Sequence, residues 1–174
     1  MRIAIISVSD RASRGIYEDR GGPAIAAWLN RVVSSPYELE TSVIADGIES
    51  VSAALIAACD TAAAGLVLTT GGTGPAPRDL TVEATRAVIG KELPGFGEVM
   101  RQASLREVPT AILSRQTAGI RNRSLIVNLP GKPSAIETCL EAVFPAIPYC
   151  LDLIDAGRIE TDPAILTSFR PKGS

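Results

Sequence analysis

The stretch GLVLTTGGTGPAPRDLT, residues 65 to 81, contains the signals that decide the fold of this chain. Its first part, Gly65–Thr70, is an apolar run with the length and composition of a buried strand. A glycine-rich loop follows, and a helix is expected to begin at Leu80 or Thr81, with Glu83 favourably placed near its start. A strand, a polar loop and a helix in this order form the repeating unit of parallel α/β sheets.

The same alternation runs through the rest of the chain. Apolar, β-branched runs predict strands, and apolar residues repeated at helical spacing predict helices. The expected strands are Arg2–Val8, Glu38–Ile44, Gly65–Thr70, Thr110–Leu113 and Ser124–Leu129. The expected helices are Pro23–Val33, Ile48–Ala63, Leu80–Ile89, Glu98–Arg106, one that begins at a capping box of Ser134 and Glu137, and Ile147–Ala156. The alternation predicts right-handed crossovers and a mostly parallel sheet with helices on both faces.

The chain length fits one domain. The 174 residues contain no internal repeat and no linker, so we expect a single unit over residues 1–174. The segment Gly157–Ser174 is polar and interrupted by prolines, which predicts a peripheral tail on the surface.

Composition narrows the possible functions. The chain has no histidine, so acid–base or metal chemistry must rely on carboxylates. Lysine and arginine number 17 against 19 acidic residues, a net charge of −2, and no run of basic residues forms a face. A nucleic-acid partner is therefore not expected.

The cysteines and the apolar runs give expectations about location. Cys59, Cys139 and Cys150 are far apart in apolar surroundings, which indicates free thiols of the core in a reducing compartment. No apolar run approaches the roughly 20 residues of a membrane span, and the apolar start of the chain is too short for a signal peptide. We therefore expect a cytoplasmic protein with no membrane partner.

Polar loops follow the predicted strands at their carboxyl ends, where parallel α/β sheets bind ligands. We expect these loops to gather on one rim of the sheet. They are Ser7–Arg20, Asp46–Gly47, Thr69–Asp79 and Asn128–Lys132.

The glycine-rich loop suits a phosphate group. Gly71, Gly72 and Gly74 can adopt positive φ and expose N–H groups ahead of a helix, and Thr73 can add a hydroxyl. Neither a P-loop nor a dinucleotide fingerprint is present, since no lysine follows the glycines and Pro77 replaces the third glycine of the fingerprint. At this point a turn that needs glycine only for its geometry is an equally open alternative.

Two aspartates flank this loop in the expected sheet. Asp46 leaves the second strand and Asp79 leaves the third, and neighbouring parallel strands lie about 4.8 Å apart. The two carboxylates can then flank one phosphate with Mg²⁺ between them. The alternative is that each aspartate caps the following helix, and one side chain can serve both roles.

Several other polar residues also have structural interpretations. Ser9 and Asp10 suit a turn, Asp19 suits the cap of a helix beginning near Gly22, and Asn128 suits the support of a Pro-Gly turn.

Six segments together resemble the molybdopterin adenylyltransferases, the MogA/MoaB family, which is also represented by the G domains of gephyrin-type proteins. They span nearly the whole chain in compatible order, and TTGGTGP followed by PGF and NLPG is highly specific. The ending, VFPAIPYCLDLIDAG with IETDP and FRPK, resembles the MogA branch. The segments are SVSDRASRGIYEDRGGPA, the Asp46 loop, LTTGGTGPAPRDLT, PGFGEVMRQASL, PTAILSRQTAGIR and LIVNLPGKPSAI.

The resemblance implies a three-layer α/β/α sandwich that assembles as a homotrimer. It implies a Mg²⁺-dependent nucleotidyltransferase that joins AMP from ATP to the terminal phosphate of molybdopterin and releases pyrophosphate. The product would then go to a molybdenum insertase. The segment after Cys139 is shorter than in some members of the MogA branch, which insert a hairpin there.

The resemblance also implies roles for individual residues. Asp46 and Asp79 match the two essential acidic positions, where Mg²⁺ would bind. The nucleotide-phosphate loop matches Gly71, Gly72, Thr73 and Gly74. Positions that shape or line the pterin side match Ser7, Ser9, Asp10, Asp19, Ser104, Ser114, Asn128, Pro130, Gly131 and Lys132.

Two other functions are consistent with the same rim. A non-catalytic, molybdopterin-binding scaffold trimer would use the same loops, because binding and chemistry share one surface. A nucleotide pyrophosphatase of related fold would break down ATP without pterin, but the chain has no obvious second acidic cluster for water activation.

Overall fold

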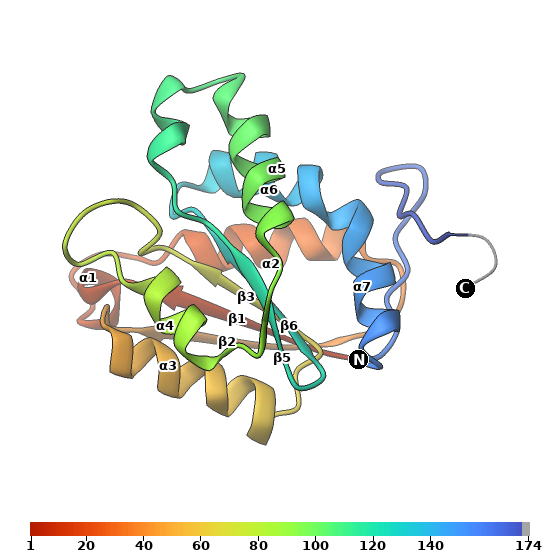
Figure 1. Ribbon diagram of the computed structural model, residues 1–174, viewed down its shortest axis with the longest axis horizontal. Coiled ribbons are helices and arrows are strands. Elements are labelled where there is room, and N and C mark those ends of the chain that lie inside the picture. The colour runs from red at the N-terminus through yellow and green to blue at the C-terminus, as the bar shows by residue number, and fades with distance from the viewer. Residues whose placement is uncertain (172–174) are drawn as a thin grey trace.

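A six-stranded, mostly parallel sheet forms the middle layer of the structure (Figure 1). The computed structural model describes residues 1–171. The strand order is β2-β1-β3-β6-β5-β4, in which β2, β1, β3 and β6 are parallel and β5 and β4 add an antiparallel edge. The strands are β1 Arg2–Val8, β2 Glu38–Ile44, β3 Leu66–Thr70, β4 Lys91–Glu92, β5 Ala118–Arg121 and β6 Ser124–Leu129.

Helices cover both faces of the sheet, so the predicted three-layer α/β/α sandwich is confirmed. One face packs against α2 Gly21–Val32, α5 Pro94–Leu105, α6 Pro133–Val143 and α7 Ile147–Leu153. The other face packs against α3 Ile48–Ile56, its π-helical extension Ala57–Thr61, and α4 Thr81–Val88. A short helix, α1 Asp10–Ser13, follows β1, and 3-10 turns occupy Pro109–Leu113 and Phe144–Ala146. Within residues 1–171, no helix combines the length and the apolar character that crossing a membrane requires.

Strand β1 shows how the sequence divides the core. Ile3 and Ile5 point to the layer of α2 and α6, whereas Ala4 and Ile6 point to the layer of α3 and α4. Successive side chains of a strand alternate between faces, so an uninterrupted apolar run is what a sheet covered on both sides requires.

The cysteines are free thiols, as predicted. Cys59 and Cys139 are buried and Cys150 is partly buried. Burial raises the pKa of all three thiols.

Four local predictions are wrong. The expected strand Thr110–Leu113 lies in a 3-10 turn, and the antiparallel strands β4 and β5 were not expected. Helix α5 begins at Pro94 and not at the expected Glu98, because proline fits the first helical position. The capping box is absent: Lys132 precedes α6 without a side-chain cap, and Glu137 instead pairs with Arg31.

The segment after α7 is only partly peripheral, which corrects the predicted tail. Ile159 is fully buried in the core, and Thr161 forms an antiparallel bridge with Val33 at the end of α2. A Cβ atom on Gly157 would lie 3.1 Å from the Met1 side chain, so this segment starts beside the first residue of the chain. Residues 172–174 of the predicted tail lie outside the described residues.

Candidate active site

The four polar loops lie side by side at the carboxyl edge of the parallel strands. The ends of β2 and β1 are joined by a bond from Ser9 N–H to the Ile44 carbonyl, 2.9 Å. A Cβ atom on Gly71 would lie only 2.4 Å from the Val8 carbonyl, so the glycine loop touches the end of β1. The Thr70 hydroxyl donates to the Pro130 carbonyl over 2.8 Å, which joins β3 to the loop after β6. We call this edge the rim.

The glycines of the loop are needed by the protein's own packing. Gly71 and Gly72 have φ of 95° and 64°, values that side-chain-bearing residues rarely adopt. A Cβ atom on Gly72 would lie 2.2 Å from the Thr81 hydroxyl oxygen, and one on Gly74 would lie 2.7 Å from Asp79 Oδ2. The geometric explanation of these glycines is therefore correct.

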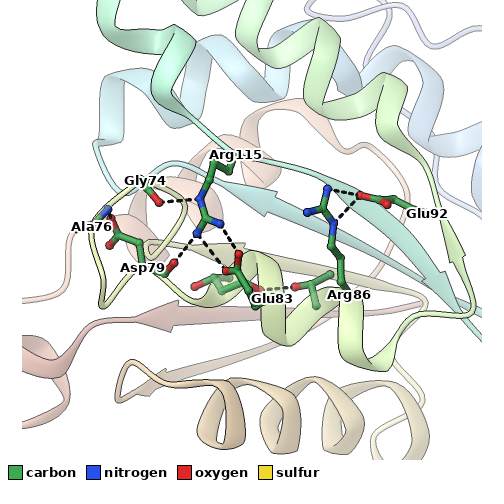
Figure 2. A network of polar contacts seen from close by, with 9 residues as sticks. Gly74, Ala76, Asp79, Glu83, Arg86, Glu92 and Arg115 are labelled. Carbon is green, nitrogen blue, oxygen red and sulfur yellow. Dashed lines mark hydrogen bonds and ion pairs between the residues drawn. The ribbon is translucent and has the colours of Figure 1, made fainter.

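Arg115 fastens this loop to α4, as Figure 2 shows. Its Nε donates to the Gly74 carbonyl over 2.9 Å and its Nη2 to the Asp79 carbonyl over 2.5 Å. Both terminal nitrogens bind the Glu83 carboxylate. All three guanidinium nitrogens thus bind acceptors of the protein.

Sequence analysis gave no role to Arg115. Its partners lie 32 to 41 residues earlier in the chain, so no local pattern could reveal them. A signal did exist, since Arg115 directly follows Ser114 inside one of the segments that carry the family resemblance.

The Arg115–Glu83 pair also changes the electrostatics of the rim. The hydrogen bonds from Arg115 lower the pKa of the Glu83 carboxyl, and Glu83 in turn raises the pKa of Arg115. The charge of Asp79 contributes to the raised pKa of Arg115, which shows that this cation lies within electrostatic range of the loop's aspartate.

Asp79 braces the loop and is not a helix cap. Its Oδ2 accepts a hydrogen bond from the Ala76 N–H over 3.0 Å. Leu80 precedes α4, with no side-chain cap at that end. Asp79 Oδ1 has no hydrogen bond within the described part of the chain and so has a lone pair available for a ligand.

Asp46 is paired with Asp10 across the ends of β2 and β1. Asp46 Oδ2 accepts from the Asp10 N–H over 2.9 Å, and Asp10 Oδ1 accepts from the Asp46 N–H over 3.1 Å. Gly47 precedes α3 and no side chain caps it, so the capping interpretation of Asp46 is also wrong.

The strand order corrects the argument that placed Asp46 and Asp79 on neighbouring strands. Strand β1 lies between β2 and β3, so the two aspartates stand on either side of the loop after β1. No hydrogen bond joins them among residues 1–171.

A pocket of about 210 Å³ lies next to the glycine loop. One of its sides is formed by the end of α5 and the 3-10 turn Pro109–Leu113, and the other by the loop after β6. Four of the residues predicted for the pterin side line it: Ser104, Ser114, Pro130 and Lys132. The next residue predicted for this side, Gly131, lies against the glycine loop, since its Cβ would be 3.7 Å from Gly71 Cα. Residues 130–131 therefore connect the two: Pro130 lines the pocket, and Gly131 lies against the glycine loop.

A buried amide lies at the back of this pocket. Gln116 accepts a bond from the Ser114 hydroxyl at its Oε1, 2.6 Å, and directs its Nε2 toward the Cys139 sulfur, 3.3 Å away. The Ser104 hydroxyl is 3.6 Å from the same sulfur. The Ser114 Oγ, whose proton is engaged by Gln116 Oε1, also accepts a bond from the Gln116 backbone N–H over 3.5 Å.

The remaining predicted residues are not in this pocket. Ser7 donates to Asp19 over 2.6 Å, Asp19 accepts from the first N–H groups of α2, and both residues line a separate pocket of about 500 Å³ beside β2. Ser9 caps α1 by accepting from the Ala12 N–H. The structural interpretations of Asp19 and Ser9 are thus correct.

Asn128 supports the rim from beneath. Its side chain is fully buried and its Nδ2 donates to the hydroxyls of Thr69 and Thr85, which ties β6 to β3 and α4. These bonds go to Thr69 and Thr85 and not to the Pro-Gly turn that Asn128 was expected to support, and a role of Asn128 on the pterin side stays a prediction.

Asp10, Asp46 and Asp79 are acidic groups at the rim that could hold a divalent cation. Each has one carboxylate oxygen free of hydrogen bonds within residues 1–171. The described residues contain no cluster of three acidic, cysteine or histidine side chains that could cage a metal. This donor set fits Mg²⁺, which commonly binds one or two carboxylates together with phosphate oxygens and water.

Comparisons with known proteins agree with this geometry. The family model described as a probable molybdopterin binding domain matches residues 4–149. A molybdopterin adenylyltransferase of Helicobacter pylori J99 is 55% identical over 172 residues, covering 99% of this chain and 98% of that protein. The molybdopterin adenylyltransferase of Escherichia coli K12 is 47% identical and covers 100% of this chain and 95% of its own.

Solved structures give the same assignment. The molybdopterin biosynthesis enzyme MoaB of Thermus thermophilus superposes with a TM-score of 0.82 at 40% identity, over 90% of this chain and 98% of that one. The molybdopterin biosynthesis Mog protein of Mycobacterium ulcerans superposes with a TM-score of 0.80 at 40% identity, over 88% and 98%. With matches that span both chains almost entirely, this protein belongs to the MogA/MoaB family of molybdopterin-binding proteins.

Proposed function

We propose that this protein is a molybdopterin adenylyltransferase, which transfers AMP from ATP to the terminal phosphate of molybdopterin during molybdenum cofactor biosynthesis. Full-length relatives carry this name. The structural observation that carries the proposal is the connection of the glycine loop to the 210 Å³ pocket through residues 130–131. Two substrates bound at these two places would have their phosphates next to each other.

The glycine loop would hold the phosphates of ATP. The N–H groups of Gly72, Thr73 and Gly74 donate to no acceptor within residues 1–171. Backbone N–H groups that precede a helix form a favourable site for an anion.

The pocket lined by Ser104, Ser114 and Lys132 would hold the pterin end of molybdopterin. Lys132 is the cationic side chain among its lining residues, and its ammonium group makes no ion pair within the described residues. A free ammonium is suited to the phosphate of molybdopterin, because charge-assisted hydrogen bonds are stronger than neutral ones.

Asp46 and Asp79 would hold Mg²⁺, which would supply positive charge between the phosphates of the two substrates. The chain's own residues then position the reactants: the loop N–H groups fix the phosphates of ATP, and Lys132 fixes the attacking phosphate.

The proposed reaction needs no general base. An oxygen of the terminal phosphate of molybdopterin attacks the α-phosphorus of ATP and forms a new P–O bond. The bond from that phosphorus to the β-phosphate oxygen breaks, and pyrophosphate leaves with the electron pair. The attacking phosphate is already ionised near neutral pH, which is consistent with a chain that lacks histidine.

An assay with molybdopterin, ATP and Mg²⁺ tests the proposal. We expect adenylylated molybdopterin and pyrophosphate in equal amounts, detected by mass spectrometry and a coupled phosphate assay. Chelation of the metal with EDTA should stop the reaction. Tight pterin binding without pyrophosphate release would instead show a binding or scaffold protein, and ATP breakdown without pterin would show a pyrophosphatase.

We also propose that the protein forms a homotrimer in the cytoplasm and passes its product to a molybdenum insertase. Exposed apolar side chains on and after α5, at Leu105, Val108, Ile112 and Leu113, support contact with another chain. The three free thiols support a reducing compartment. Light scattering on a gel-filtration column would measure the mass of the assembly.

A further inference from the structure

The carbonyl groups at the start of the glycine loop are held by Thr81, the first residue of α4. The Thr81 hydroxyl donates to the Gly71 carbonyl over 2.9 Å, and the Thr81 N–H donates to the Gly72 carbonyl over 3.1 Å. Both carbonyls therefore point toward the beginning of α4.

The carbonyl groups in the rest of the loop are held by Arg115. Its N–H donates to the Thr73 carbonyl over 2.9 Å, its Nε donates to the Gly74 carbonyl over 2.9 Å, and its Nη2 donates to the Asp79 carbonyl (Figure 2). One residue thus engages three carbonyl groups of the loop, two of them through its side chain.

Peptide geometry makes these bonds decide where the N–H groups point. In a trans peptide unit the carbonyl and the following N–H point in opposite directions, and no peptide bond among residues 1–171 is cis. Because the carbonyls of Gly71, Gly72 and Thr73 face Thr81 and Arg115, the N–H groups of Gly72, Thr73 and Gly74 face the opposite side. Thr81 and the main-chain N–H of Arg115 thus orient these three donors. The Arg115 side chain holds the carbonyls of Gly74 and Asp79, which follow the donors in the loop.

We propose that Arg115 is a positioning residue that orients this loop for phosphate binding without touching the nucleotide. The inference rests on the proposed function, which places the phosphates of ATP at these N–H groups. Loss of the Arg115 side chain would free the carbonyls of Gly74 and Asp79, and a carbonyl that rotated toward a phosphate would repel it.

Glu83 in turn holds the Arg115 side chain in position. Its carboxylate holds both terminal nitrogens of Arg115 and so fixes the guanidinium beneath the loop. If Arg115 acts by position, removal of the Glu83 charge loosens the guanidinium and weakens ATP binding. If Arg115 instead bound the phosphate directly, the Glu83 carboxylate would compete with the phosphate for Arg115, and its removal would strengthen ATP binding. The two mechanisms therefore predict opposite signs for the same variant.

Calorimetric titration of ATP, without pterin, tests the inference on the full chain. We expect Arg115→Gln to raise the Kd for ATP by about tenfold and Glu83→Gln to raise it by about threefold. Molybdopterin affinity should stay within about twofold in both variants, which an unfolded or generally loosened protein would not show. Arg115→Lys, which keeps the charge but loses the fork of donors, should fall between the wild type and Arg115→Gln.

Arg86, about one helical turn after Glu83 on α4, provides a matched control for Arg115. Arg86 pairs with Glu92 over 2.9 Å and contacts no part of the loop (Figure 2). Arg86→Gln removes the same charge as Arg115→Gln and should leave the Kd for ATP unchanged.

Two outcomes would overturn the inference: ATP affinity in Arg115→Gln equal to that of the Arg86→Gln control, or tighter ATP binding by Glu83→Gln. If Arg115→Gln does not fold, as judged by circular dichroism, Arg115→Lys and Glu83→Gln decide the question. The AMP-transfer assay is scored separately, so a protein that binds ATP as expected but transfers no AMP refutes the proposed function and leaves the inference intact. A wild-type protein that binds no ATP refutes both.

Discussion

The glycine loop and the pocket beside it share one rim, yet they are built differently. In the loop, Thr81 and Arg115 engage consecutive main-chain carbonyls through several hydrogen bonds. In the pocket, the Lys132 ammonium has no partner among residues 1–171, and Ser104 has only a 3.6 Å contact with a sulfur.

The difference follows from the groups that would contact each ligand. Main-chain N–H groups cannot rotate independently of the chain, so a site made from them must be held in place by other residues. Side chains such as Lys132 can adopt their binding rotamer when the ligand arrives, at the cost of some side-chain entropy. The rim thus joins a preorganised half to an adaptable half, and the following predictions test that contrast.

The largest effect is expected from the two acidic residues of the rim, Asp46 and Asp79. Asp46→Asn and Asp79→Asn keep an oxygen for the N–H groups of Asp10 and Ala76 but lose the charge. We expect AMP transfer to fall by a factor of about 100 or more in each variant, with little change in thermal stability. Single-turnover kinetics and thermal melting measure the two quantities, and near-normal turnover in both variants would remove these residues from the mechanism.

A pair of glycine substitutions compares the two halves directly. In Gly72→Ala the new methyl group lies at positive φ and would meet the Thr81 hydroxyl, so we expect a loss of about 2 kcal/mol in the free energy of unfolding. In Gly131→Ala the nearest atom would be 3.7 Å away, an ordinary contact, and we expect a change below about 0.5 kcal/mol. Urea denaturation measures both, and equal stabilities would show that the loop is not the more rigid region.

Removal of the pocket's cation should affect one substrate only. Lys132→Gln is expected to raise the KM for molybdopterin by about tenfold and to leave the KM for ATP within about twofold. Steady-state kinetics with each substrate varied in turn gives the two values. A rise in the KM for ATP of the same size would show that the two halves do not recognise separate substrates.

The smallest effect concerns pH. Hydrogen bonds from Arg115 lower the pKa of Glu83, so the stability that this pair contributes is fully present above the unfolded pKa, about 4.3, and is lost as the pH falls through the folded value. At neutral pH, Glu83→Gln should therefore be less stable than the wild type by less than about 1 kcal/mol, since the pair is partly exposed.

That difference should shrink as the pH falls below about 4.3 and through the lowered folded pKa of Glu83, because both proteins then carry an uncharged side chain at this position. Urea titrations at neutral and acidic pH measure it. A difference that is the same at both pH values would mean that the ion pair is not its cause.

Sequence patterns predicted the elements that depend on burial. Continuous apolar runs identified β1 and β6 because both faces of these strands are covered, and the rim followed from the parallel alternation of strands and helices. The short run Thr110–Leu113 was misassigned because four apolar or β-branched residues fit a strand and a tight turn equally well.

The order of strands in space could not be predicted, since an alternating pattern does not say which strands are neighbours. For this reason Asp46 and Asp79 were expected on adjacent strands, although β1 lies between them. Arg115 was missed for a related reason, because its partners are distant in the chain and appear only after folding. The residues that touch a ligand can be suggested by a motif, whereas those that hold the motif in shape require the structure.

The contact between Met1 and Gly157 lies at the amino edge of the sheet, opposite the rim. Linkers attached before β1 and after the core would therefore leave from one side and would not cross the glycine loop. A host polypeptide can accordingly carry such a unit as an insert with the rim open to small molecules.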